Sequence, residues 1–96
     1  MTGHLRHGAL EPFTVDIPDK DLQELRRRLT ATRWAHDVGN TDWSYGVERS
    51  WLREMVRYWA EDFDWRAAEK QINALPNWRV EIEGTPIHFI HVKGTG

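Results

Sequence analysis

Histidine and carboxylate side chains are the groups in this chain that could do chemistry, and their spacing argues against a shared site. His88 and His91 form a His-x-x-His pattern. We expect both on a β-strand, where residues three apart point to opposite faces. His4 and His7 lie in an N-terminal stretch without periodicity, and a mobile chain end does not hold coordination geometry. The sequence therefore predicts no metal site and no cofactor.

The acidic residues Glu61, Asp62 and Asp64 lie at the junction of two expected helices. Asp64 can cap the second helix by accepting hydrogen bonds from its free N–H groups, and capping explains the cluster better than general acid–base catalysis. We find no nucleophile beside a base, no Gly-x-Ser-x-Gly turn, no glycine-rich phosphate loop and no His-Glu-x-x-His. By its own residues, the chain is predicted not to be a catalyst.

Length and composition exclude several classes of function. The chain has 96 residues, a formal net charge of −2 and no cysteine. It forms at most one domain, and its charge gives no case for nucleic acid or an anionic membrane as a partner. The lack of cysteine excludes disulfides and fits a reducing, cytoplasmic location. No apolar run approaches the roughly 18 residues of a transmembrane helix.

The stretch 45–75 predicts two amphipathic helices with a tight corner at 62–64. The apolar positions of the first helix share one side, which is wide enough to dock on a core. They are Val47, Trp51, Leu52, Met55, Val56, Trp59 and Phe63. The second helix has its own apolar face, formed by Trp65, Ala68, Ile72 and Leu75, and Pro76 ends it.

An extended segment and a further helix are predicted before these two. Residues 13–17 alternate between apolar and polar, which is typical of a half-buried strand, and Pro18 ends the alternation. Asp19 is the predicted N-cap of the helix that follows. Leu22, Leu25 and Leu29 give this helix a narrow apolar stripe.

Arginines cluster near the C-terminal end of this first helix. The run Arg26–Arg28 suggests a small DNA-binding helix as one hypothesis. Glu24 stands at helical spacing from Arg27 and Arg28, so that it can pair with either. A solvated helix face is the favoured interpretation.

Three aromatic residues, Trp34, Trp43 and Tyr45, lie in the predicted loop 34–46, in which Asn40, Thr41 and Asp42 are interpreted as polar filler. Such side chains are too bulky to be left in water. We expect them to pin the loop to a neighbouring surface, either of this chain or of another.

Two strands follow the helices, at 78–83 and 87–92. Trp78, Val80 and Ile82 alternate and are expected to face inward, and Gly84 supplies the turn of a β-hairpin. The second strand is apolar on both faces, which is typical of a strand covered on two sides. The predicted fold class is α+β, with about three helices, an N-terminal extended segment and a C-terminal hairpin.

The order of these motifs resembles the N-terminal domain of microsomal-type epoxide hydrolases. The centre of the resemblance is Tyr58-Trp59 and Phe63-Asp64-Trp65-Arg66, followed by Glu69 and Asn73. Further matching positions before it are Phe13, Val15, Ile17, Pro18, Leu25, Arg28-Leu29, Thr32-Arg33-Trp34, Trp43 and Gly46. Those after it are Ile82, Gly84, Ile87-His88-Phe89 and His91. Each piece is weak alone, but their order and spacing are specific.

The resemblance implies a scaffold that wraps and braces an α/β-hydrolase body, in the same polypeptide or in a separate chain. In that family the body opens epoxides to vicinal diols with an Asp nucleophile, a His–acid pair and cap tyrosines. On this view the chain is truncated before the body and is predicted to be inactive alone. The expected division is a flexible leader over 1–12, a helical N-terminal domain over 13–77 and a hairpin over 78–96 that begins the hydrolase sheet.

The expected partner-binding residues are Trp34, Trp43, Ile87, Phe89, Ile90 and Val92. An alternative from another class is a free-standing interaction or dimerisation module without catalysis. An exposed strand edge makes a homodimer compatible with either hypothesis.

Overall fold

The computed structural model describes residues 5–96, which divide into two compact units. The helical unit comprises residues 17–64, and the sheet unit comprises residues 65–96 together with the N-terminal segment up to Asp16. This division groups the third helix with the strands, whereas the sequence had suggested grouping it with the other helices.

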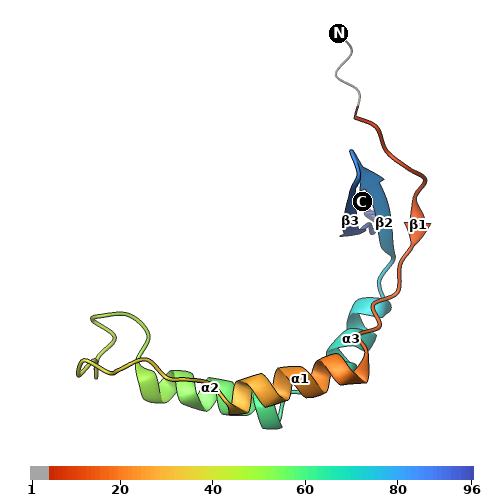
Figure 1. Cartoon of the computed structure of the whole chain (residues 1–96). Coiled ribbons are helices and arrows are strands. Elements are labelled where there is room, and N and C mark those ends of the chain that lie inside the picture. The colour runs from red at the N-terminus through yellow and green to blue at the C-terminus, as the bar shows by residue number, and fades with distance from the viewer. Residues whose placement is uncertain (1–4) are drawn as a thin grey trace. The chain divides into compact units, whose positions relative to one another are not determined.

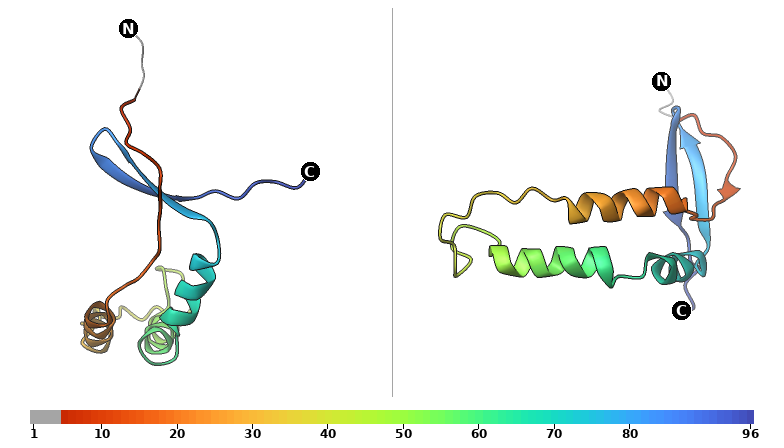
Figure 2. Two further views of the ribbon diagram at one scale, coloured as in Figure 1. Left: turned by 90° about the vertical axis from the view of Figure 1, so that its right-hand side faces the viewer. Right: turned by 60° about the horizontal axis from the view of Figure 1, so that its bottom comes forward.

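The helical unit consists of α1 (Asp19–Thr30), α2 (Arg49–Glu61) and the long loop between them. The two helices run antiparallel side by side (Figure 2). The predicted N-cap of α1 is wrong by one residue, because Pro18 occupies that position and makes no side-chain capping bond. Its backbone is extended, at φ −59° and ψ 144°, so that helical geometry begins only at Asp19.

A side-chain cap begins α2. The carboxylate of Glu48 accepts hydrogen bonds from the backbone N–H groups of Ser50 and Trp51, both at 2.9 Å, and from the Ser50 hydroxyl at 2.6 Å. These bonds satisfy N–H groups that have no partner inside the helix and lower the pKa of Glu48. At the other end, the N–H groups of Asp62 and Phe63 both donate to the Tyr58 carbonyl, which makes the predicted corner.

The sheet unit contains α3 (Trp65–Asn73) and a three-stranded antiparallel sheet of β1 (Glu11–Pro12), β2 (Asn77–Ile82) and β3 (Thr85–Ile90). The strand order is β1-β2-β3, as Figure 1 shows. The predicted hairpin is confirmed, with its strands beginning one or two residues earlier than expected. Its turn residues Glu83 and Gly84 have φ values of 49° and 80°, the left-handed pair that a tight hairpin turn requires.

The third strand, β1, was not predicted. Glu11 and Pro12 pair with Arg79 and Trp78 in a stretch that the sequence analysis assigned to the leader. Upstream, the Gly8 N–H donates to the Glu81 carbonyl at 2.9 Å. Residues 1–4, including His4, lie outside the described part of the chain. With three helices and an antiparallel sheet, the predicted α+β class is confirmed.

The described residues bury very little apolar surface. Val80, on the inward face of β2, is 7% exposed and is the one buried hydrophobic residue among them; Trp78 and Ile82 beside it are half-buried. Asn77, at 5%, and Glu69, at 8%, are buried polar residues. Since burial of apolar area is the main driving force of folding, this core is small for the number of large side chains available.

Two predictions of coverage are wrong for this chain. The apolar side of α2 does not dock on a core, because no residue of that helix is buried. The strand β3, expected to be covered on two faces, has Ile87 and Ile90 exposed and Phe89 half-buried. Periodicity indicates which side of an element is apolar, and coverage of that side depends on what lies next to it.

No helix within residues 5–96 has the length and apolar character needed to cross a membrane.

Candidate functional site

The most distinctive surface of the helical unit is a row of apolar side chains, called the α2 stripe here. It consists of Val47, which lies just before α2, and of Trp51, Met55 and Trp59 within α2, spaced four residues apart. Each is between 44% and 50% exposed. Leu52 and Tyr58 of the same helix are also exposed. An exposed apolar row of this kind is typical of a surface that another protein segment covers.

Of the loop residues predicted to bind a partner, Trp43 lies beside the stripe. Its ring makes an edge contact with Trp51, with the ring centroids 5.2 Å apart. Its φ of 69° is left-handed, which is uncommon for a bulky residue. The loop therefore holds a tryptophan half-exposed against α2 at some conformational cost.

Trp34, the other predicted loop residue, lies against α2 at a different point. The guanidinium of Arg53 stands 5.3 Å from the centroid of its ring, a cation–π contact that holds the start of the loop to the helix. Tyr45 remains largely exposed. The expectation that aromatic residues pin this loop is thus confirmed for Trp34 and Trp43, on the surface of their own unit.

The four predicted residues of the second strand lie in the sheet unit. Ile87 and Phe89 are opposite Val80 and Trp78 on one face, Ile90 is on the other face, and Val92 follows the strand. Ile87, Ile90 and Val92 are exposed. Because β3 is at the edge of the sheet, these side chains are accessible to an incoming segment.

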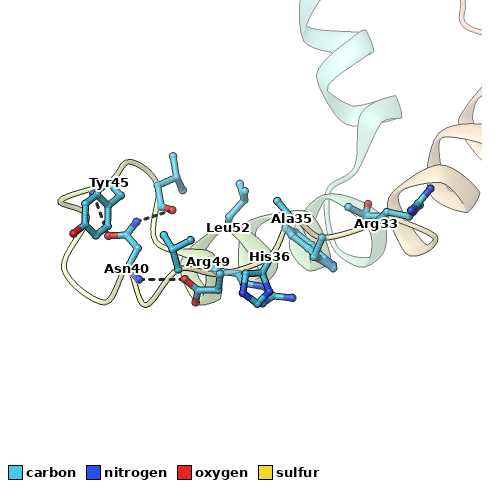
Figure 3. A pocket seen from close by; sticks show the side chains of 12 residues that line it. Arg33, Ala35, His36, Asn40, Tyr45, Arg49 and Leu52 are labelled. Atoms are coloured by element: carbon cyan, nitrogen blue, oxygen red, sulfur yellow. Dashed lines mark hydrogen bonds between the residues drawn. The ribbon is translucent and has the colours of Figure 1, made fainter.

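A cavity of about 480 Å³ lies between the loop and the start of α2 (Figure 3). Its lining includes Trp34, His36, Asn40, Arg49 and Leu52. Sequence reasoning missed this cavity because its walls come from a loop without periodicity.

Asn40 is the residue that shapes the loop, and interpreting it as polar filler was wrong. It is only 7% exposed. Its Nδ2 donates to the carbonyls of Gly46, at 3.0 Å, and Val47, at 3.3 Å, while its Oδ1 accepts from the Tyr45 N–H at 3.3 Å. An asparagine between glycine positions was the available signal, since its amide can serve as donor and acceptor at once.

Two of the three arginines of α1, Arg27 and Arg28, form an intrahelical network with Glu24. Glu24 accepts from Arg27, at 2.6 Å, and from Arg28, at 2.9 Å, and these bonds lower the pKa of Glu24 to about 2. The predicted pairing is confirmed, with both partners at once. Arg57 of α2 likewise donates to Glu54, Glu61 and Asp62, which raises its pKa.

The histidines do not form a metal centre among residues 5–96, where no group of potential ligands gathers. His88 Nε2 lies 2.8 Å from Asn77 Oδ1, and its ring stacks on Phe13 with the centroids 4.8 Å apart. This histidine is therefore part of the packing between β2, β3 and the extended segment.

Comparison with known proteins places these features in a family. A family model described as "Epoxide hydrolase N terminus" matches residues 10–96. The chain is 42% identical over 85 residues to a putative epoxide hydrolase of Stigmatella aurantiaca, covering 88% of this chain and 19% of that protein. It is 33% identical over 89 residues to epoxide hydrolase 1 of Oryctolagus cuniculus, covering 93% of this chain and 20% of that protein.

Solved structures agree with the sequence relatives. The epoxide hydrolase of Aspergillus niger matches with a TM-score of 0.77 at 35% identity, over 85% of this chain and 22% of that chain. The juvenile hormone epoxide hydrolase of the silkworm Bombyx mori matches with a TM-score of 0.78 at 25% identity, over 92% of this chain and 23% of that one. The chain spans about a fifth of the length of the curated relatives it matches. It belongs to the family of epoxide hydrolase N-terminal domains.

Proposed function

We propose that this chain serves an epoxide hydrolase as the domain that packs against and braces the α/β-hydrolase body, where epoxides are hydrolysed to vicinal diols. The observation that carries the proposal is the family match over residues 10–96, in which every helix and strand of the described structure falls. The relatives that share this segment are epoxide hydrolases.

The distribution of apolar surface supports a bracing role. The α2 stripe and the exposed residues of β3 leave large side chains about half in water. Full burial of an exposed large apolar side chain gains about 1.5–3 kcal/mol, and each of these side chains would gain the part that corresponds to its exposed area. Within residues 5–96 the core contains one buried hydrophobic residue, and a body that covers these surfaces would supply the stability that this core does not provide.

The proposed contact residues are Trp34 and Trp43 in the helical unit and Ile87, Phe89, Ile90 and Val92 in the sheet unit. The free edge of β3 offers unpaired backbone groups to a further strand of a hydrolase sheet. The helical unit offers the α2 stripe. The cytoplasmic location suggested by the lack of cysteine is part of the same proposal.

A chimera tests the proposal. In the Aspergillus niger epoxide hydrolase, the N-terminal segment that matches this chain is replaced by this chain. We expect the chimera to fold and to form diol from an aryl epoxide such as styrene oxide, measured by chromatography, and the 96-residue chain alone to form none. A soluble, folded chimera without activity, or turnover by the chain alone, would contradict the proposed division of labour.

The same preparations test the alternative of a dimerisation module. Sedimentation of the 96-residue chain measures its mass, and pairing of two β3 edges would give twice 11.4 kDa. A dimer that persists while the chimera is inactive would favour the module over the brace.

A further inference from the structure

The cavity beside α2 contains a cation that forms no ion pair with any of residues 5–96. Arg49 is the first residue of α2 and lines the cavity together with Trp34 and Leu52 (Figure 3). Its Nε is buried, and among residues 5–96 it has no hydrogen-bond partner. A buried N–H without an acceptor carries a desolvation penalty. Such a cost calls for an explanation in a helix whose cap is otherwise fully formed.

Two other arginines of this helix, Arg53 and Arg57, each have an interaction partner. Arg57 donates to three carboxylates, and Arg53 stands over the ring of Trp34. The cap residue Glu48 is next to Arg49 in sequence, but its carboxylate accepts hydrogen bonds from Ser50 and Trp51. Among residues 5–96, Arg49 therefore differs from Arg53 and Arg57 in having a buried Nε without an acceptor.

The lining of the cavity carries a surplus of positive charge. Arg33 and Arg49 are its two cations. The acidic residue of the lining is Asp37, whose Oδ1 accepts from the N–H groups of Gly39, at 3.0 Å, and Asn40, at 3.1 Å. That carboxylate shapes the loop and forms no ion pair with Arg49 within the described residues. The cavity is thus complementary to an anion.

We propose that Arg49 is the docking point for a carboxylate side chain, Asp or Glu, of the α/β-hydrolase body. This inference rests on the proposed function, since the body is its partner. The guanidinium fork binds a carboxylate with two parallel N–H···O bonds, and Nε is one of the two donors of that fork.

The walls of the cavity favour a protein side chain over a free anion. Trp34, Val47 and Leu52 supply apolar surface in the cavity that Arg49 lines. A small phosphate requires several converging donors, whereas a protein segment brings its own apolar neighbours to cover these walls. The α2 stripe begins at Val47, so the proposed ion pair would lie at one end of the apolar contact and fix its register.

The first test compares Arg49→Leu in two settings, the 96-residue chain and the Aspergillus niger chimera. In the chain alone, Leu removes a buried unpaired donor, so the melting temperature should stay the same or rise. In the chimera, Leu leaves the partner carboxylate unpaired, so the melting temperature should fall by about 2–4 °C. Arg26→Leu, on exposed α1, is the control and should change neither. Equal effects of Arg49→Leu in both settings would overturn the proposal.

The second test identifies the acceptor. Arg49→Lys places an amine at this position, and a carbodiimide couples an amine to a carboxylate in direct contact. We expect mass spectrometry of the treated chimera to find the introduced lysine joined to an Asp or Glu of the body. A link to a second copy of the chimera, or none in a chimera that folds and hydrolyses epoxide, would overturn the docking point and leave the proposed function intact.

A third measurement addresses the free anion. Inorganic phosphate added to the 96-residue chain should leave its melting temperature unchanged at matched ionic strength. Stabilisation by phosphate that Arg49→Leu abolishes would overturn the proposal in favour of a small-anion site. A chimera with Arg49 intact that folds but shows no hydrolysis would instead overturn the proposed function, so the two failures are distinguishable.

Discussion

Glu24 determines the charge state of the exposed face of α1, because one carboxylate binds both Arg27 and Arg28. These bonds lower its pKa from 4.5 to about 2. A folded-state pKa below the unfolded one means that the carboxylate stabilises the fold above about pH 4.5 and loses this contribution as the pH falls toward 2.

We therefore predict that Glu24→Gln lowers the melting temperature at neutral pH, and that its difference from the unmodified chain disappears between pH 4.5 and about pH 2. Thermal melts followed by circular dichroism across this range measure the difference. Glu11→Gln is the control, since the Glu11 carboxylate forms no ion pair among residues 5–96. A difference that does not depend on pH would show that the pairing contributes nothing.

Asn73 ties the N-terminal extended segment to the end of α3. Its Nδ2 donates to the Val15 carbonyl and its Oδ1 accepts from the Val15 N–H, both at 2.8 Å. We predict that Asn73→Ala lowers the free energy of unfolding by about 1–3 kcal/mol, because both backbone groups of Val15 lose their partner. Urea titration measures the loss, and exposed Gln71→Ala is the control.

Asn73→Asp refines this test. The carboxylate keeps the acceptor for the Val15 N–H but places an oxygen, in place of the amide donor, against the Val15 carbonyl. Because two acceptors repel each other, Asn73→Asp should also lower the free energy of unfolding at neutral pH. If Asn73→Ala lowers the free energy of unfolding no more than Gln71→Ala does, the two hydrogen bonds between Asn73 and Val15 do not order this segment.

At the scale of elements, most of the fold could be predicted from the sequence. The recurrence of Val47, Trp51, Met55 and Trp59 predicted α2, and the alternation of Trp78, Val80 and Ile82 predicted β2, because these periods are properties of the elements themselves. Strand β1 could not be predicted, since two residues have no period and their pairing with β2 depends on a segment far away in the chain.

The cavity escaped prediction for a related reason. Asn40, Asp37 and Arg49 meet through a loop whose conformation is set by hydrogen bonds between side chain and backbone. Such bonds follow no repeating pattern, so their partners become visible only in three dimensions. The unpaired state of Arg49 is likewise a property of its surroundings.

At the scale of elements, the conformation of the hairpin turn can be tested by replacing its glycine, Gly84. Gly84 has a φ of 80°, a left-handed conformation that costs a residue with a Cβ roughly 1–2 kcal/mol. No atom lies within 4 Å of a Cβ built there, so backbone conformation alone should decide the effect. We predict that Gly84→Ala lowers the free energy of unfolding by about this amount, measured by urea titration. Gly94→Ala, in open space and without a positive φ, should be neutral, and equal losses at both glycines would refute the argument.

At the scale of the whole molecule, the chain combines well-formed elements with a core too small to explain them alone. The side-chain cap of α2, the ion-pair networks and the hairpin turn are well formed, yet Val80 is the one buried hydrophobic residue among those described. Local interactions of this kind specify where elements begin and end, while burial of apolar area supplies most of the stability. The missing burial is what the proposed contact with a hydrolase body would add.

This reasoning predicts opposite consequences for the α2 stripe in two settings. In the 96-residue chain, the double substitution Met55→Gln with Trp59→Gln replaces side chains that are nearly half in water, so the free energy of unfolding should change by no more than about 1 kcal/mol. In the Aspergillus niger chimera the same positions would be covered, and the loss should be about 1–3 kcal/mol, because buried apolar area is exchanged for polar groups. Arg26→Gln, on α1, should be neutral in both.

A hydrophobic dye adds an independent measurement of the exposed stripe. Its fluorescence should rise with the chain alone, rise less with the double variant, and stay low with the chimera. If the double substitution destabilised the isolated chain as much as the chimera, the stripe would be packed within this chain, and the brace would have to contact the body through β3 instead.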